Sequence, residues 1–128
     1  MPNLSQSRIG QIAITCKDVA RASAFYRDVL GLRHLFDAGP NLSFFDCGGV
    51  RLMLTTAERA EDDHPGSILY YFVSDIDAVY RELSGKGVKF LDAPHIVAPL
   101  PDHDLWLTAF NDSEGNTMGI MEERKRPA

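Results

Sequence analysis

The chain has 128 residues, 45% of them hydrophobic, and 13 Lys and Arg residues against 18 Asp and Glu residues give a formal net charge of −5. This length fits one domain, and the negative balance lacks the basic surface that neutralises phosphates, so we expect no nucleic acid and no anionic membrane as partners. No apolar run approaches the roughly 20 residues that cross a bilayer, and residues 1–10 form no apolar signal core. We therefore expect a cytoplasmic protein.

The first half of the chain predicts a strand, a helix and a hairpin. Residues 8–16 alternate in polarity, as a half-buried strand does. Asp18 stands where a helix N-cap belongs, and an apolar stripe follows at helical spacing until Gly31. Two extended runs, FFDC and VRLMLTT, then flank Gly48 and Gly49, whose tolerance of positive φ angles predicts a tight turn. The apolar stripe of the helix comprises Val19, Ala22, Phe25, Val29 and Leu30.

The second half repeats this order of elements. The run SILYYFVS predicts a strand, Asp75 a second helix N-cap, and Gly85 the end of that helix. A shift of about 57 residues superimposes Asp18 on Asp75, and a shift of about 66 residues further along superimposes Phe44 on Phe110. Internal similarity of this kind indicates two copies of one module.

The repeat sets the expected domain organisation. We expect a single domain over residues 1–128, with one module at residues 8–56 and a second at residues 67–122. The segment between them, AERAEDDHPG, is polar and charged and contains proline and glycine, which is typical of a linker.

Three segments of the chain resemble the vicinal oxygen chelate superfamily, which includes glyoxalase I, bleomycin-resistance proteins, extradiol dioxygenases and methylmalonyl-CoA epimerase. They are DVARASAFYRDVLGL, SDIDAVYRELSGKGV and the closing FNDSEGNTMGIMEE, and the resemblance covers nearly the whole chain. It implies an α+β fold of two βαβββ modules whose curved mixed sheets form an open, barrel-like cleft, usually in a homodimer. It identifies the fold more specifically than the chemistry, because one fold supports many functions.

The resemblance also implies where a metal would bind. Enzymatic members use a divalent metal that holds two substrate oxygens and stabilises negative charge as a Lewis acid. Its ligands, usually His, Glu or Gln, come from inward-facing strands, and matching by motif puts their positions on Gln11, Met53, Ile68 and Gly119. Of these four side chains, only that of Gln11 offers an oxygen, so we expect neither the usual metal site nor a cofactor.

The same strands predict what lines the cleft. Residues two apart on a strand share a face, so Arg51 should accompany Met53, and Tyr70 and Phe72 should follow Ile68. Aromatic surface beside an arginine suits a flat or amphipathic molecule that carries an anionic group. Two alternatives stay open: the aromatic stripe fills the core, and Arg51 pairs with a nearby acid. The expected ligand-binding residues are Gln11, Arg51, Met53, Ile68, Tyr70, Phe72, Trp106 and Gly119.

The histidines could in principle build another site, but none of them pairs with another at ligand spacing. They are His34, His64, His95 and His103. The proline-rich segment PHIVAPLPDHDLWLTAF could form the rim of a cleft beside Trp106, and His95 or His103 could act there as a general base. The alternative is a strand connection whose imidazoles bind backbone groups and whose tryptophan fills the core.

Two classes of function therefore remain. The first is a metal-free binding protein, similar to the bleomycin-resistance branch, that holds a small aromatic or amphipathic molecule. The second is a lyase, isomerase or dioxygenase with a displaced divalent metal or with acid and base residues such as His103. The unsuitable residues at the metal positions favour the binding protein.

Overall fold

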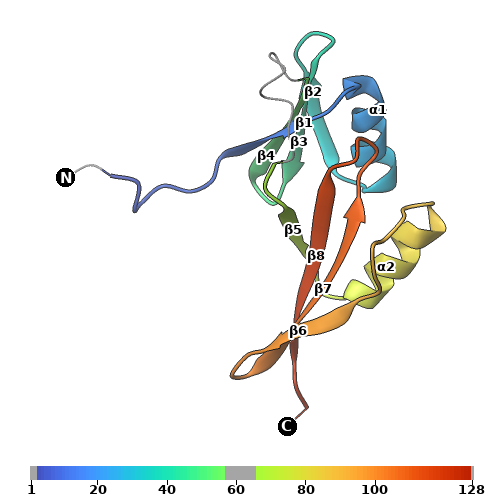
Figure 1. Cartoon of the computed structure of the whole chain (residues 1–128). Coiled ribbons are helices and arrows are strands. Elements are labelled where there is room, and N and C mark those ends of the chain that lie inside the picture. Colours follow the sequence, from blue (N-terminus) through green and yellow to red (C-terminus); the bar gives the residue numbers. More distant parts are fainter. Residues whose placement is uncertain (1–2, 57–65, 128) are drawn as a thin grey trace. The chain divides into compact units, whose positions relative to one another are not determined.

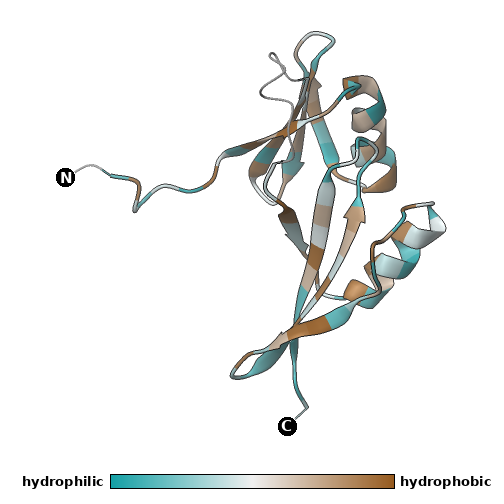
Figure 2. Cartoon of the chain, in the orientation of Figure 1, coloured by the Kyte–Doolittle hydropathy of each residue, from teal (hydrophilic) through white to brown (hydrophobic). Residues whose placement is uncertain are grey.

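The structure is a computed structural model that describes residues 3–56 and 66–127, and the chain divides into two compact units, Met1–His64 and Pro65–Ala128. Each unit combines helix with a mixed sheet, and the strands of each sheet carry both hydrophobic and hydrophilic positions (Figures 1 and 2). Most of the expected linker, residues 57–65, lies outside the described residues, as does His64.

The first unit has the order strand, helix and three strands. Its sheet runs β1-β4-β3-β2, in which β1 is parallel to β4 and the other neighbours are antiparallel. The helical segment contacts β3 and β4 and so covers one face of this sheet. The elements are β1 (Gln11–Thr15), α1 (Val19–Ala24), η1 (Phe25–Val29), β2 (Arg33–Asp37), β3 (Leu42–Cys47) and β4 (Val50–Thr55).

The second unit repeats this topology. Its sheet runs β5-β8-β7-β6, with β5 parallel to β8, and α2 packs against β8 (Figure 1). The elements are β5 (Leu69–Phe72), α2 (Ile76–Gly85), β6 (His95–Pro99), β7 (His103–Asn111) and β8 (Thr117–Lys125). The predicted α+β fold of two βαβββ modules is therefore confirmed. The proline-rich segment supplies the β6–β7 hairpin, which agrees with the strand connection that the sequence offered as the alternative to a rim.

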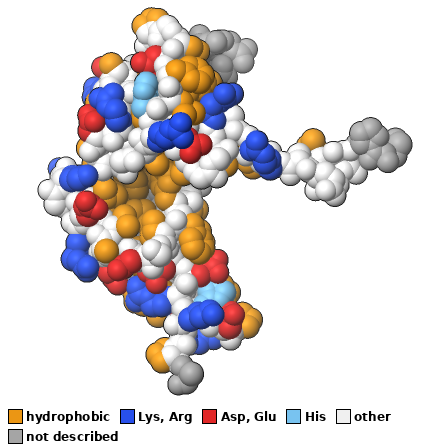
Figure 3. Space-filling view, turned by 180° about the vertical axis from the view of Figure 1, so that it is seen from behind, with side chains coloured by type: hydrophobic (Ala, Val, Ile, Leu, Met, Phe, Trp, Pro, Cys, Tyr) orange, Lys and Arg blue, Asp and Glu red, His pale blue; other side chains and the backbone are white. Residues whose placement is uncertain are grey.

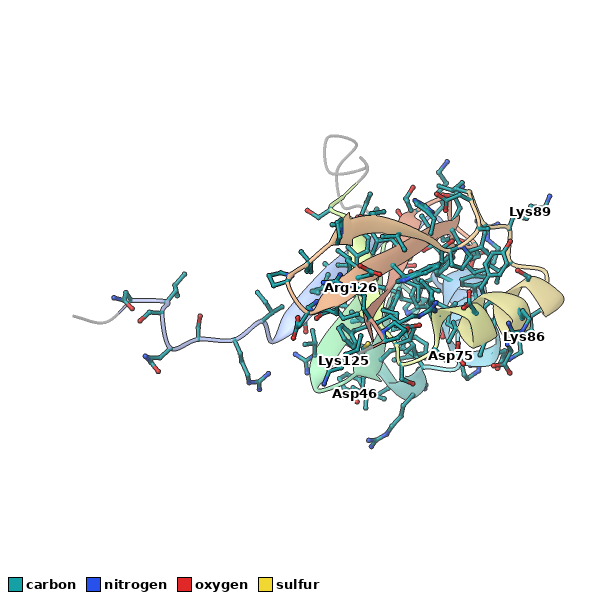
Figure 4. The ribbon with its side chains drawn as sticks, turned by 90° about the horizontal axis from the view of Figure 1, so that it is seen from below. Asp46, Asp75, Lys86, Lys89, Lys125 and Arg126 are labelled. Atoms are coloured by element: carbon teal, nitrogen blue, oxygen red, sulfur yellow. The ribbon has the colours of Figure 1, made fainter. Side chains whose placement is uncertain are left out.

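Both predicted helix N-caps are confirmed. An Asp18 carboxylate oxygen accepts from the backbone N–H of Arg21 at 3.0 Å, and Asp75 accepts in the same way from Ala78 at 3.1 Å. Such a bond satisfies one of the N–H groups that the first turn of a helix leaves without a partner. Asp75 and Lys86, which flank α2, are labelled in Figure 4.

The first helix ends differently from a regular helix. It continues into η1, where the N–H of Leu30 bonds to the carbonyl of Phe25 at 3.0 Å, one residue further back than in an α-helix. Tyr26, which the predicted stripe omitted, is fully buried, whereas Phe25 is only half-buried. The reason is packing: the mostly apolar ring of Tyr26 lies 6.2 Å from that of Phe45, centroid to centroid.

The hairpin turns fix the alignment of the two modules. Cys47 pairs with Val50 across Gly48 and Gly49, whose φ angles of 59° and 91° confirm the predicted tight turn. In the first unit six residues separate the paired residues Phe45 and Leu52, and in the second unit seven residues separate the paired residues Phe110 and Met118, so the second connection is one residue longer. The longer turn corrects one correspondence: Phe110 is the counterpart of the fully buried Phe45, not of Phe44.

The core of each unit lies between its helix and the facing side of its sheet. Alternate strand residues are buried there, as a sheet with one covered face requires. None of the described helices is both long enough and apolar enough to cross a membrane. Buried core residues include Tyr26, Phe45, Leu52 and Leu54 in the first unit, and Ile76, Phe110, Met118 and Ile120 in the second.

Candidate functional site

In the first unit, Gln11 is held by two neighbours on the sheet face away from the helix. Gln11 lies opposite Arg51, and Ala13 lies opposite Met53, so Gln11, Arg51 and Met53 share this face. The amide nitrogen of Gln11 donates to Sδ of Met53 at 3.7 Å, and Nε of Arg51 donates to Oε1 of Gln11 at 2.7 Å. Both ends of the amide are therefore engaged within the protein.

Aromatic rings adjoin this cluster. The Arg51 guanidinium lies 5.3 Å from the centre of the Phe44 ring, within cation–π range, and Phe44 stacks on Phe36 at 4.6 Å. The sequence did not single out these two rings as site residues. A bulge between His34 and Phe36 breaks the alternation of β2, so only the register shows that Phe36 shares a face with Phe44.

The acid nearest to Arg51 by register is Asp46, which lies directly opposite it on β3 and is labelled in Figure 4. Within the described part of the chain, no ion pair joins the two side chains at 4.0 Å or less. Asp46 does act on Cys47: burial and, secondarily, the negative charge of Asp46 raise the pKa of the Cys47 thiol. A salt bridge of Arg51 to a nearby acid is thus not formed among the described residues.

In the second unit, the ring of Tyr70 lies over Gly119. The two residues are partners in the parallel pair of β5 and β8, and a Cβ atom added at Gly119 would lie far inside van der Waals contact with Cδ1 and Cε1 of Tyr70. The space that a side chain at position 119 would need is therefore occupied by the Tyr70 ring.

The surface around this ring is apolar. Ile68, Tyr70 and Phe72 are 46%, 49% and 63% exposed, although large hydrophobic side chains are usually buried. Tyr70 and Phe72 are partners of Gly119 and Met121, which places all four on one face of the sheet. Hydrophobic side chains gather on the surface of this unit in Figure 3. The predicted aromatic stripe is thus exposed surface within its unit.

Trp106 lies on the other face of this sheet. It is the partner of Glu122, whose carboxylate accepts from the backbone N–H of Ile76 at the start of α2. The guanidinium of Arg124 lies 4.2 Å from the centre of the Trp106 ring. The structure therefore separates Trp106 from Tyr70 and Phe72, with which the sequence had grouped it. The cause is register: Trp106 is paired with Glu122, which is adjacent to Met121 on β8, and adjacent residues of a strand point to opposite faces.

The described histidines are occupied with local partners. His34 bonds to Asp37 at 2.8 Å, and His95 bonds to the carbonyl of Ala93 at 2.9 Å. The ring of His103 lies between two carboxylates, with Nδ1 2.6 Å from Asp102 and Nε2 2.9 Å from Glu123. The hydrogen bond from His103 is the main reason that the pKa of Asp102 lies below its usual value.

The four family positions do not fit a divalent metal held in the usual way. In the first unit, Gln11 donates to a thioether that is a poor ligand for hard cations. In the second unit, Ile68 has no donor atom and the Tyr70 ring covers Gly119. Over residues 3–56 and 66–127, moreover, no three His, Cys, Asp or Glu side chains converge as a metal site would require.

The Tyr70 ring predicts an unusual response to a small substitution. We expect Gly119→Ala to lower the free energy of unfolding by about 1 kcal/mol, because the new methyl group must displace the ring. In a Tyr70→Ala background, Gly119→Ala should instead raise the free energy of unfolding by about 0.5 kcal/mol, because glycine inside a strand is less favourable than alanine. Urea unfolding followed by Trp106 fluorescence measures both. Effects of equal sign in the two backgrounds would contradict the placement of the ring.

Comparison with known protein families agrees with this fold. Residues 8–120 match the model of the Glyoxalase/Bleomycin resistance protein/Dioxygenase superfamily. The chain therefore belongs to that superfamily. No curated protein matched the chain in a sequence comparison.

Solved structures of similar fold include members of the same superfamily. One from Sphaerobacter thermophilus DSM 20745 has 25% sequence identity and a TM-score of 0.78, over 91% of this chain and 98% of that one. A lactoylglutathione lyase from Agrobacterium tumefaciens has 23% identity and a TM-score of 0.71, over 92% and 95%. A member from Nocardioides has 20% identity and a TM-score of 0.71, over 98% and 91%. At these identities the likeness concerns the fold.

Proposed function

We propose that this chain binds a small aromatic or amphipathic molecule without a divalent metal at the family's usual position. The observation that carries the proposal is the position of the Tyr70 ring. It covers Gly119 and fills the space that a metal-binding side chain at position 119 would need. The exposed face formed by Ile68, Tyr70 and Phe72 offers the ring and alkyl surface that an apolar ligand requires.

Two measurements test this proposal. The first is the metal content of protein purified from medium supplemented with Ni, Zn, Mn and Fe, which should stay well below one equivalent. One tightly bound equivalent would overturn the proposal and favour a lyase, isomerase or dioxygenase.

The second measurement is binding of the neutral aromatic probe 2-naphthamide by calorimetry. We expect Tyr70→Ala to weaken binding about tenfold, because it removes a stacking surface and its burial. Ile96→Ala is the matched control: Ile96 is 48% exposed in the same unit but, as the partner of Trp106, lies on the other face. Equal losses in the two variants, or no binding by the wild type, would contradict the proposal.

We also propose that the protein is a homodimer. In the described sheets, β1 and β2 in one unit and β5 and β6 in the other have one edge without a strand partner. Exposed edges offer unpaired backbone groups that a second chain can cover. Sedimentation velocity of the purified chain at micromolar concentration tests this, and a monomer at all concentrations would contradict it.

A further inference from the structure

Arg51 has an unused donor edge. Its Nε hydrogen is donated to Gln11 Oε1 at 2.7 Å. A guanidinium carries five N–H hydrogens, so the four on the two terminal nitrogens remain. Within residues 3–56 and 66–127, these nitrogens have no hydrogen-bond or ion-pair partner, and the side chain is exposed. The free edge is the end-on pair of nitrogens, which matches the two oxygens of a carboxylate.

The orientation of this edge is fixed by the protein. Gln11 holds one side of the guanidinium, and the Phe44 ring lies 5.3 Å from its central carbon. Gln11 is in turn fixed, because its amide nitrogen donates to the Met53 thioether at 3.7 Å. An arginine that is already oriented loses less conformational entropy when it binds an anion than a freely rotating one does.

The neighbourhood supplies an apolar surface as well as a charge. Phe36 and Phe44 form a stacked pair on the same face of the sheet as Arg51, and Phe36 is 47% exposed. Asp46 lies opposite Arg51, but among the residues that the structure describes no ion pair of 4.0 Å or less joins their two side chains. A ligand bound here would therefore combine a flat body with an anionic group.

We propose that the free edge of Arg51 binds the carboxylate of an aromatic ligand end-on, and that Gln11 is a positioning residue for this contact. The inference rests on the proposed small-molecule binding and adds a chemical class of ligand, an aromatic carboxylate, for the face of the first unit that carries Arg51. It also gives Gln11 a purpose other than metal binding: its amide oxygen orients the arginine. The affinity arises from direct hydrogen bonds at one oriented edge, because the net charge of the chain, −5, repels anions at long range.

A matched pair of probes, 2-naphthoate and its neutral amide 2-naphthamide, tests this inference. The wild type should bind 2-naphthoate about tenfold more tightly, the size expected of a charge-assisted pair of hydrogen bonds at an exposed arginine. Arg51→Met should abolish this preference and leave 2-naphthamide binding unchanged. Gln11→Glu should reduce it, because a carboxylate there would pair with the guanidinium.

Two control variants separate local contact from overall charge. Arg27→Met removes the same charge from η1, where Arg27 pairs with Asp28 at 2.9 Å, and should preserve the preference for 2-naphthoate. Asp46→Asn should preserve or increase it. In 15N-resolved NMR spectra, the Arg51 Nε–Hε resonance should shift with 2-naphthoate, and Gln11→Leu should broaden it before any ligand is added.

The outcomes distinguish the two proposals. Equal binding of the two probes with an unchanged Arg51 resonance would overturn the carboxylate site and leave the proposed function standing. Equal loss of preference in Arg27→Met and Arg51→Met would also overturn it, because the effect would then be one of net charge. Failure of both probes to bind would overturn the proposed function and the inference together.

Discussion

Phe110→Ala should lower the free energy of unfolding by about 3–5 kcal/mol, which is the usual cost of truncating a fully buried phenylalanine. Phe110 is 1% exposed, and its ring meets that of Phe90 edge to face at 5.6 Å. It also pairs with the buried Met118 across β7 and β8. The neighbours on two strands cannot all move inward, so a cavity should remain.

Chemical denaturation followed by tryptophan fluorescence measures this loss, because the single tryptophan, Trp106, lies on the same strand as Phe110. Phe72→Ala is the matched control, since it removes the same ring from a position that is 63% exposed in its unit. We expect that control to cost less than about 1 kcal/mol. If the two substitutions cost the same, Phe110 does not belong to the core of this unit.

Glu122→Gln should have the second-largest effect, a loss of about 1–3 kcal/mol at neutral pH. The buried carboxylate accepts from the backbone N–H of Ile76 at 2.8 Å and from Nε of Arg124 at 2.8 Å. Arg124 also binds Asp77 at 3.0 Å and stacks on Trp106. Glu122 thus joins the start of α2 to β8, and Arg124 extends this network to Trp106 on β7. The neutral amide weakens the two contacts that Glu122 makes itself.

The pH dependence of this loss is also predicted. The hydrogen bond from Arg124 is the main reason that the pKa of Glu122 lies below its usual value of 4.5. A carboxyl group whose pKa falls on folding stabilises the protein above the pKa of the unfolded chain, and this contribution is lost as the pH falls through the folded value. The difference between wild type and Glu122→Gln should therefore be constant above about pH 5 and shrink below about pH 4.5.

Denaturation curves between pH 3 and pH 8 measure this profile. Glu82→Gln, an exposed change on α2, is the control and should alter stability by less than about 0.5 kcal/mol throughout. If the stability lost in Glu122→Gln does not vary with pH, the negative charge of Glu122 does not contribute to stability, and the prediction is wrong.

Local patterns were sufficient for much of the fold. Asp18 and Asp75 are N-caps in the structure because the capping bond involves residues three apart, which the sequence displays directly. The hairpin at Gly48 and Gly49 was equally predictable, because glycine tolerates the positive φ angles that this turn requires. The correspondence of Phe44 with Phe110 was wrong because it depends on the length of a turn, and a constant offset cannot follow that change.

The candidate site was predictable only where strand alternation was regular. On β4 and β5 the two-residue period grouped Arg51 with Met53, and Tyr70 with Phe72. Phe36 was missed because a bulge interrupts β2. The face on which Trp106 lies could not be predicted, because it follows from the pairing of Trp106 with Glu122 on β8.

By itself, the sequence determined the order of elements, the duplication of the module and the residue types at the positions that the resemblance assigns to a metal, because these depend on residue type and local spacing. Only the tertiary structure decided which side chains touch. That Gln11 orients Arg51, and that Tyr70 covers Gly119, are consequences of strand register. Register is set by pairings between residues far apart in the chain, and a shift of one position would turn each of these side chains to the opposite face.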